Sequence, residues 1–285
     1  MKVAYEETTP EARTLKQYPH RKIFTTGLFL VFLFVFSIDC FPKEARVAVS
    51  PENAMKANAV ATEGETAFEH RDFYAALIKY LEAYRLNPNS EHLCNRLGIA
   101  YSQLNLYGEA IQAFRRAITL NRKFSYPYNN LGSVYFAQKS YRQAEKYIKK
   151  AISLNGKEAS FHLNLGSLYL EKKKRDSAMT EWRKSFALDP GIFSRRGIAN
   201  ISSSGSSLME RYFFLARIMA ASGNLEAALE NLKLAFNNGF TNIEEIVKNP
   251  DFDLIRNDKR FDQFLQDVAL WLKFQPKDDI RPPLR

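Results

Sequence analysis

The sequence predicts an all-α protein made of repeated helix pairs, and three observations support that prediction. A Leu-Gly pair recurs at Leu97-Gly98, Leu131-Gly132 and Leu165-Gly166, and the interval between copies is the same each time. Apolar residues three, four and seven positions apart place one apolar stripe on each expected helix. Small residues recur at fixed points, where they let paired helices approach to roughly 8 to 10 Å.

The residues behind each Leu-Gly pair repeat as well. A Tyr comes three positions after each Gly, and it is followed by an Ala, a large residue and a second small residue: Tyr101, Tyr135 and Tyr169; Ala110, Ala144 and Ala178; Phe114, Ile148 and Trp182; Ala117, Ala151 and Ser185. In this order, and in its period of about 34 residues, the chain resembles the tetratricopeptide repeat (TPR) family. The resemblance implies a TPR α-solenoid, a right-handed superhelix of helix-turn-helix repeats whose concave face receives another protein.

The same register assigns five repeats. One period before the first Leu-Gly pair, Gly64 precedes Ala76 and Tyr80 in the same order. One period after the last pair, the Gly position falls on Asn200 inside a Ser/Gly-rich run, and the register fails there. A fifth repeat fits only when it is displaced, so that Leu215-Ala216 takes the place of the Leu-Gly pair. We therefore expect repeats over residues 57–90, 91–124, 125–158, 159–190 and 209–242, with a Ser/Gly-rich insertion over 191–208.

Two helical stretches follow the fifth repeat, and Asn249-Pro250 separates them. In the second stretch, Phe261, Phe264 and Val268 recur at helical spacing and predict a stripe that covers the exposed face of the last repeat. Residues 243–275 are therefore expected to form C-terminal capping helices, and residues 276–285 a loose tail.

The N-terminal part of the sequence carries a membrane signal. Residues 1–22 are polar, and residues 23–38 read IFTTGLFLVFLFVFSI without a charge. Secretory signal cores need roughly 7 to 15 apolar residues, and bilayer-spanning helices about 17 to 25. Residues 23–40 are therefore expected to be a signal peptide or a hydrophobic anchor helix, followed by a tether over 41–56.

Cys40 bears on how this signal is processed. A cysteine directly after an apolar run resembles a bacterial lipoprotein signal, in which the chain is cut before a lipidated cysteine, although Asp39 stands where a small residue is expected. A lipoprotein, an uncleaved anchor and a plain secretory signal therefore stay open. Basic residues before the run favour repeats on the extracytoplasmic side of a bacterial cell envelope membrane; they are Arg13, Lys16, Arg21 and Lys22.

The net charge is +10, and residues 139–196 hold 14 Lys and Arg against 6 Asp and Glu. This excess would attract an acidic partner or anionic headgroups, or it would only solvate outer helix faces. Nucleic-acid binding is not expected, because Tyr135, Tyr169 and Trp182 occupy repeat-core positions and not a basic surface stripe. The two cysteines form no metal or disulfide pattern.

The sequence offers no catalytic constellation. No histidine belongs to a metal-binding or paired arrangement, and no Gly-rich phosphate loop is present; the histidines are His20, His70, His92 and His162. We therefore expect a chain that is not an enzyme and has no metal, cofactor or small-molecule substrate.

The expected partner is a protein or peptide. By analogy with the family, the first helix of each repeat lines the concave groove, and the candidate groove residues are Asn95, Tyr126, Asn129, Asn130, Ser133, Phe136, Asn164 and Ser167. An Asn side chain carries a donor and an acceptor, so it can hold the backbone of an extended peptide of any sequence. Alternatively, these residues only cap or solvate helices. A carboxylate clamp like that of TPR co-chaperones is not expected, because Ala61, Glu65 and Arg96 occupy the matching positions.

These features together predict a membrane-tethered, non-enzymatic scaffold of the bacterial envelope. The chain resembles bacterial membrane-anchored or lipoprotein TPR proteins, which implies a role in assembling an envelope complex such as a secretion or pilus machine. Two alternatives stay open. One is an N-terminally anchored receptor of a eukaryotic organelle with cytosolic repeats, and the other is an accessory module of an enzyme complex.

Overall fold

The computed structural model describes residues 46–193 and 208–273. Within these residues every regular element is a helix, which confirms the all-α prediction. None of the described helices is long and apolar enough to cross a membrane. The expected signal or anchor over 23–40, with Cys40, lies outside the described residues.

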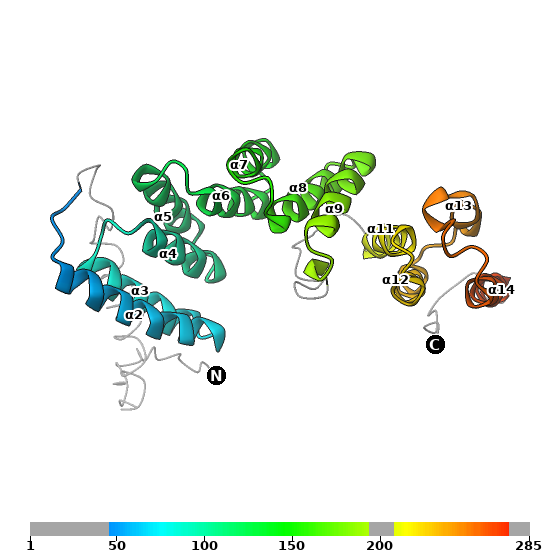
Figure 1. The fold of residues 1–285 in the computed structure, drawn as a ribbon, viewed down its shortest axis with the longest axis horizontal. Coiled ribbons are helices and arrows are strands. Elements are labelled where there is room, and N and C mark those ends of the chain that lie inside the picture. The colour runs from blue at the N-terminus through cyan, green and yellow to red at the C-terminus, as the bar shows by residue number, and fades with distance from the viewer. Residues whose placement is uncertain (1–45, 194–207, 274–285) are drawn as a thin grey trace, which may run out of the picture. The chain divides into compact units, whose positions relative to one another are not determined.

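The helices follow one another in close pairs (Figure 1), and in each pair the two helices pack along their length. The pairs are α2 (Pro51–Glu69) with α3 (Phe73–Leu86), α4 (Glu91–Gln103) with α5 (Tyr107–Leu120), α6 (Ser125–Ala137) with α7 (Tyr141–Leu154), α8 (Ala159–Glu171) with α9 (Arg175–Leu188), and α11 (Leu208–Ala221) with α12 (Leu225–Asn237). The second helix of each pair also contacts the first helix of the next pair from α3 to α8.

A glycine in the first helix faces a large side chain of the second helix in each of the first four pairs. A methyl group on Gly98 would lie 2.5 Å from the Phe114 ring, and one on Gly132 would lie 2.6 Å from Ile148. Carbon atoms do not pack that closely in protein interiors. The recurring glycine therefore sets the close approach of the paired helices, as the sequence pattern predicted.

The turns inside the helix pairs share one backbone conformation. Arg71, Asn105, Lys139 and Lys173 have positive φ between 57° and 62°, and they follow one another at the repeat period. One further period would place the positive-φ residue of the fifth turn at position 207. In the structure this residue is Gly223, with φ 77°. The displacement from 207 to 223 equals the predicted displacement from 200 to 216, so the fifth pair repeats the turn geometry of the others.

The predicted tether over 41–56 is wrong in its last six residues, because α2 begins at Pro51. Ser50 caps this helix by accepting a hydrogen bond from the Asn53 backbone N–H at 3.1 Å. Proline fits the first helical position, where its missing N–H leaves no bond unmade. Just before the helix, the side chain of Asn89 holds both polar groups of the Val47 backbone.

The predicted insertion over 191–208 is not a loop at its edges. Ile192 and Phe193 are buried, and the Phe193 ring lies 6.0 Å from that of Trp182. Leu208 begins α11. The apolar side chains at 192 and 193 join the core that the fourth repeat shares with the elements after it, and residues 194–207 lie outside the described residues.

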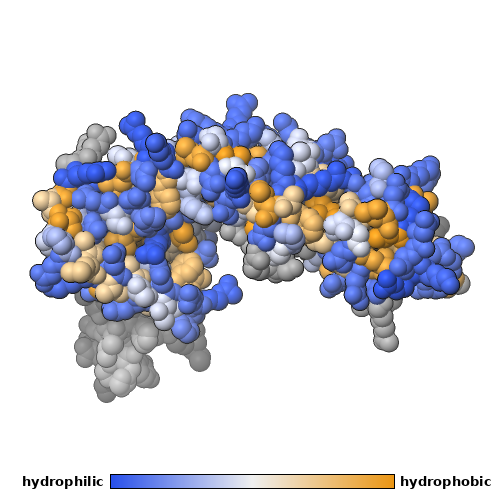
Figure 2. Space-filling view, viewed as in Figure 1, coloured by the Kyte–Doolittle hydropathy of each residue, from blue (hydrophilic) through white to orange (hydrophobic). Residues whose placement is uncertain are grey.

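Three elements follow the fifth pair: α13 (Ile243–Lys248), the 3-10 helix η2 (Pro250–Phe252) and α14 (Lys259–Lys273). Their residues Phe252, Phe261, Phe264 and Val268 are buried in one apolar cluster with residues of α8 to α12. The predicted stripe on α14 therefore faces the core. The face drawn in Figure 2 is mostly hydrophilic, with separate apolar patches between charged side chains.

Candidate protein-binding site

Four asparagine side chains join the first helices of three consecutive pairs, α4, α6 and α8. Asn130 donates to the side-chain oxygen of Asn95 at 3.0 Å, and Asn164 donates to that of Asn129 at 2.9 Å. Asn129 in turn donates to Asn130 at 3.4 Å. These four residues, which we call the asparagine ladder, therefore form one continuous chain of hydrogen bonds across three helices.

The ladder has hydrogen-bonding capacity beyond these contacts. Each amide carries two N–H donors and an oxygen with two acceptor positions, and the ladder bonds use only part of them. Asn129 is 4% exposed and connects the two halves, whereas Asn95, Asn130 and Asn164 are half-buried and reach the surface. The structure thus presents amide donors and acceptors in a row along three helices.

A different contact continues the row toward α2. Arg96 occupies the position that Asn130 and Asn164 have in later repeats, and it forms an ion pair with Glu65 of α2. Ala61, one turn earlier on α2, is fully buried. A carboxylate clamp would need exposed Lys and Asn side chains here, and these residues provide a neutralised ion pair instead.

Aromatic rings lie beside the ladder near the first turns of the same helices. The ring centres of His92 and Phe124 are 4.7 Å apart, those of Phe124 and Tyr126 5.9 Å, and those of Tyr126 and Phe161 5.4 Å. Tyr126 is 41% exposed, and its hydroxyl donates to Glu158 at 2.7 Å. This hydrogen bond to the carboxylate, followed by burial, raises the pKa of Tyr126.

The remaining predicted residues differ in accessibility. Ser133 is half-buried and donates to the Asn129 carbonyl at 3.2 Å. Phe136 is half-buried, with its ring 5.9 Å from that of Tyr141 in the next helix. Ser167 is only 1% exposed and donates to the Leu163 carbonyl at 2.8 Å, so it supports α8 from inside and offers nothing to a partner.

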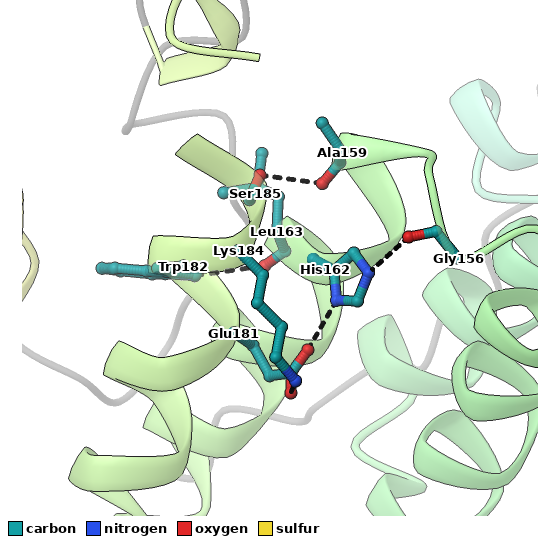
Figure 3. Close-up of polar contacts among 8 residues, drawn as sticks. All are labelled: Gly156, Ala159, His162, Leu163, Glu181, Trp182, Lys184 and Ser185. Carbon is teal, nitrogen blue, oxygen red and sulfur yellow. Dashed lines mark hydrogen bonds and ion pairs between the residues drawn. The ribbon is translucent and has the colours of Figure 1, made fainter. Parts of the chain in front are cut away.

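A buried charged cluster that the sequence analysis missed fixes α8 in place (Figure 3). His162 Nδ1 lies 2.6 Å from Glu181 of α9, and Nε2 lies 3.1 Å from the Gly156 carbonyl in the preceding loop. These two contacts hold the imidazole ring between α9 and the loop before α8. Burial alone would raise the pKa of Glu181, but hydrogen bonds from Lys184 and His162 outweigh it and lower that pKa.

A second missed cluster joins the third pair to the fourth. Glu145 of α7 lies 2.7 Å from Lys149 and 2.5 Å from Lys172 at the end of α8, and it accepts from the Tyr169 hydroxyl at 3.3 Å. Hydrogen bonds from Lys149 and Lys172 lower the pKa of Glu145 from 4.5 to about 2. Only the Glu145–Lys149 contact, four positions apart on one helix, could be expected from spacing.

Comparison with known families decides what these helix pairs are. A tetratricopeptide repeat model matches residues 93–124 and 125–157, and a second tetratricopeptide repeat model matches residues 159–192. The chain contains tetratricopeptide repeats over residues 93–157 and 159–192. The three matched repeats contain helices α4 to α9 and hence the whole asparagine ladder. Stacked repeats of this family present extended binding surfaces to other proteins, so the chain is a protein–protein interaction scaffold.

Solved structures of other repeat proteins are similar to this chain. A Pseudomonas aeruginosa PilF structure has 19% identity and a TM-score of 0.51, and the match covers 78% of this chain and 92% of that one. A MamA crystal structure has 22% identity and a TM-score of 0.43 over 65% and 96% of the two chains. TTC0263, a TPR protein of Thermus thermophilus, has 18% identity and a TM-score of 0.48 over 75% and 99%. At this identity the PilF match supports the fold alone, and no curated protein matches the chain.

Proposed function

We propose that this TPR protein is a membrane-tethered, non-enzymatic scaffold that holds an extended segment of a partner protein along the asparagine ladder. The observation that carries the proposal is the row of amide groups that reaches the surface on α4, α6 and α8. An extended backbone presents one N–H and one C=O per residue, which are the complements of these amides. Such contacts would hold a segment without reading its side chains.

The aromatic rings beside the ladder support the same proposal. A partner segment bound along the amides would pass Tyr126, a residue that is 41% exposed and that Glu158 and Phe161 hold in place. Aromatic rings that are already fixed lose little conformational freedom on binding and contribute a large apolar contact. The ladder would hold the backbone, and Tyr126 would contact a side chain.

The membrane part of the proposal comes from the sequence. The uncharged run over residues 23–38 and the cysteine that follows it support attachment to a bacterial envelope membrane, with the repeats on the extracytoplasmic side in an envelope complex. Mass spectrometry of the mature N-terminus tests this proposal. A diacylglyceryl group on Cys40 is expected. An intact Met1 without lipid would refute the proposal that the chain is cut before Cys40 and lipidated there.

Substitution of the ladder tests the binding proposal. Asn130→Ala with Asn164→Ala is expected to reduce cross-linked partner recovered from intact cells about fivefold, equivalent to about 1 kcal/mol of binding free energy. Asn58→Ala with Asn257→Ala, which removes two exposed amides elsewhere, is the matched control. Undiminished partner recovery at unchanged helix content would contradict binding along the ladder and would indicate binding at the basic residues between 139 and 196.

A further inference from the structure

The second helices of the repeats carry a cation at one shared position, the ninth residue of α5, α7, α9 and α12. These residues are Arg115, Lys149, Arg183 and Lys233. Arg115 donates to the Tyr135 hydroxyl of the next helix at 3.1 Å. Lys149 lies 5.8 Å from the centre of the Tyr169 ring. Arg183 forms an ion pair with Asp251 of η2. In three repeats, therefore, a later element supplies a phenol ring or a carboxylate to this cation.

Lys233 is the exception among these cations. No carboxylate of the described residues lies within ion-pair distance of its ammonium group. The element that packs beside it is α14, where Asp267 accepts a hydrogen bond from Gln263 at 2.8 Å. The position that a phenol or an acid fills in earlier repeats is thus left without one in the described part of the chain.

Lys233 borders a groove between α12 and α14 of about 460 Å³. The floor is apolar and consists of Leu229, Phe264 and Val268, of which the last two are buried. The rim is polar and consists of Lys233, Lys259, Arg260, Gln263 and Asp267. Arg260 is held by Asp258 at 3.0 Å, whereas Lys259, like Lys233, has no ion pair in the described structure. Among the described residues, therefore, Lys233 and Lys259 have no ion-pair partner, and Asp267 is the one carboxylate that lines the groove with them.

We propose that this groove is a second docking site, separate from the asparagine ladder, for an acidic segment of a partner protein. A carboxylate of the segment would bind between Lys233 and Lys259, as Asp251 binds Arg183 one repeat earlier. A neighbouring apolar side chain would occupy the floor, where removal from water stabilises it. Pockets that take small ligands measure about 300 to 1,000 Å³, so this groove has room for one or two anchoring side chains.

The proposal is tested by methyl NMR of the full chain in detergent during a titration with the peptide N-acetyl-Glu-Asp-Leu-Phe. This measurement detects binding with dissociation constants up to the millimolar range. The methyl signals of Leu229 and Val268 are expected to shift with saturation. Lys233→Glu with Lys259→Glu should weaken the affinity at least tenfold, and Lys233→Gln should give an intermediate loss. Lys248→Glu with Lys273→Glu, an equal charge change outside the groove, should leave the affinity unchanged.

Three results would overturn the proposal. The first is the absence of a saturable shift at Leu229 and Val268. The second is an equal loss of affinity in the groove and control variants at equal melting temperatures. The third is tighter probe binding after removal of residues 274–285, which would mean that the chain's own tail is the occupant. The variant Asn130→Ala with Asn164→Ala should bind this probe normally, so the two binding proposals can fail separately.

Discussion

Asn130 of α6 donates a side-chain hydrogen to Asn95 of α4 at 3.0 Å, although the two residues are 35 positions apart. Because both side chains are half-buried, this bond should stabilise the contact between consecutive repeats. We expect a coupling free energy of about 1 kcal/mol in a double-mutant cycle of Asn95→Ala and Asn130→Ala, measured by urea unfolding. Additive effects of the two substitutions would show that the ladder contributes nothing between repeats.

The glycine positions predict a stability change with a built-in control. Gly132→Ala should destabilise the protein by about 1 to 3 kcal/mol, because the new methyl group would meet Ile148 at 2.6 Å and the α7 backbone at 3.1 Å. Gly108→Ala on α5 has nothing within 4 Å, and alanine favours the helix there. In thermal unfolding followed by circular dichroism, the melting temperature of Gly132→Ala should be lower than that of the wild type. The melting temperature of Gly108→Ala should be equal to or higher than that of the wild type.

The turn residues predict opposite effects of two substitutions. Gly223 has φ 77° and free space around it, so Gly223→Ala should cost about 1 kcal/mol through backbone strain alone. Lys173 has φ 57° at the equivalent position, where glycine is not strained. Lys173→Gly should therefore be neutral or stabilising in urea unfolding. Loss of stability in both variants would contradict the shared turn geometry.

Glu145 predicts a pH-dependent stability difference. Its pKa falls from 4.5 to about 2 on folding, so its contribution is fully present above pH 4.5 and is lost as the pH falls toward 2. Glu145→Gln should cost about 1 to 2 kcal/mol at pH 7, since partial solvent exposure reduces the full effect. Urea unfolding at several pH values should show this difference shrinking between pH 4.5 and 2. A difference that is constant with pH would rule out the ion pairs as its cause.

Much of the fold could be predicted because one period fixes it. The residues that recur once per repeat, such as Gly132 and Ile148, face each other inside a repeat, and a local rule suffices to pair them. The start of α2 differs from the expected tether because proline, which is typical of a tether, is also favoured at a first helical position, as at Pro51. The burial of Ile192 and Phe193 could not be predicted because it depends on elements after the insertion.

The candidate site was less predictable than the fold. The sequence indicated that Asn130 and Asn164 are equivalent, but their bonds to Asn95 and Asn129 depend on how neighbouring helices are rotated. The burial of Ser167 depends on the same packing. That Lys233 has no ion-pair partner among the described residues becomes informative only when the partners of Arg115, Lys149 and Arg183 are known from the structure.

The most direct measurement of the central claim is site-specific photo-cross-linking in intact cells. A photoreactive phenylalanine analogue at Tyr126 or Phe136, beside the asparagine ladder, should cross-link to one continuous segment of a partner protein. The same analogue at Lys146 or Lys150, exposed on the second helix of that repeat, should not reach that segment. Cross-links from Lys146 and Lys150 with none from Tyr126 and Phe136 would contradict binding along the ladder.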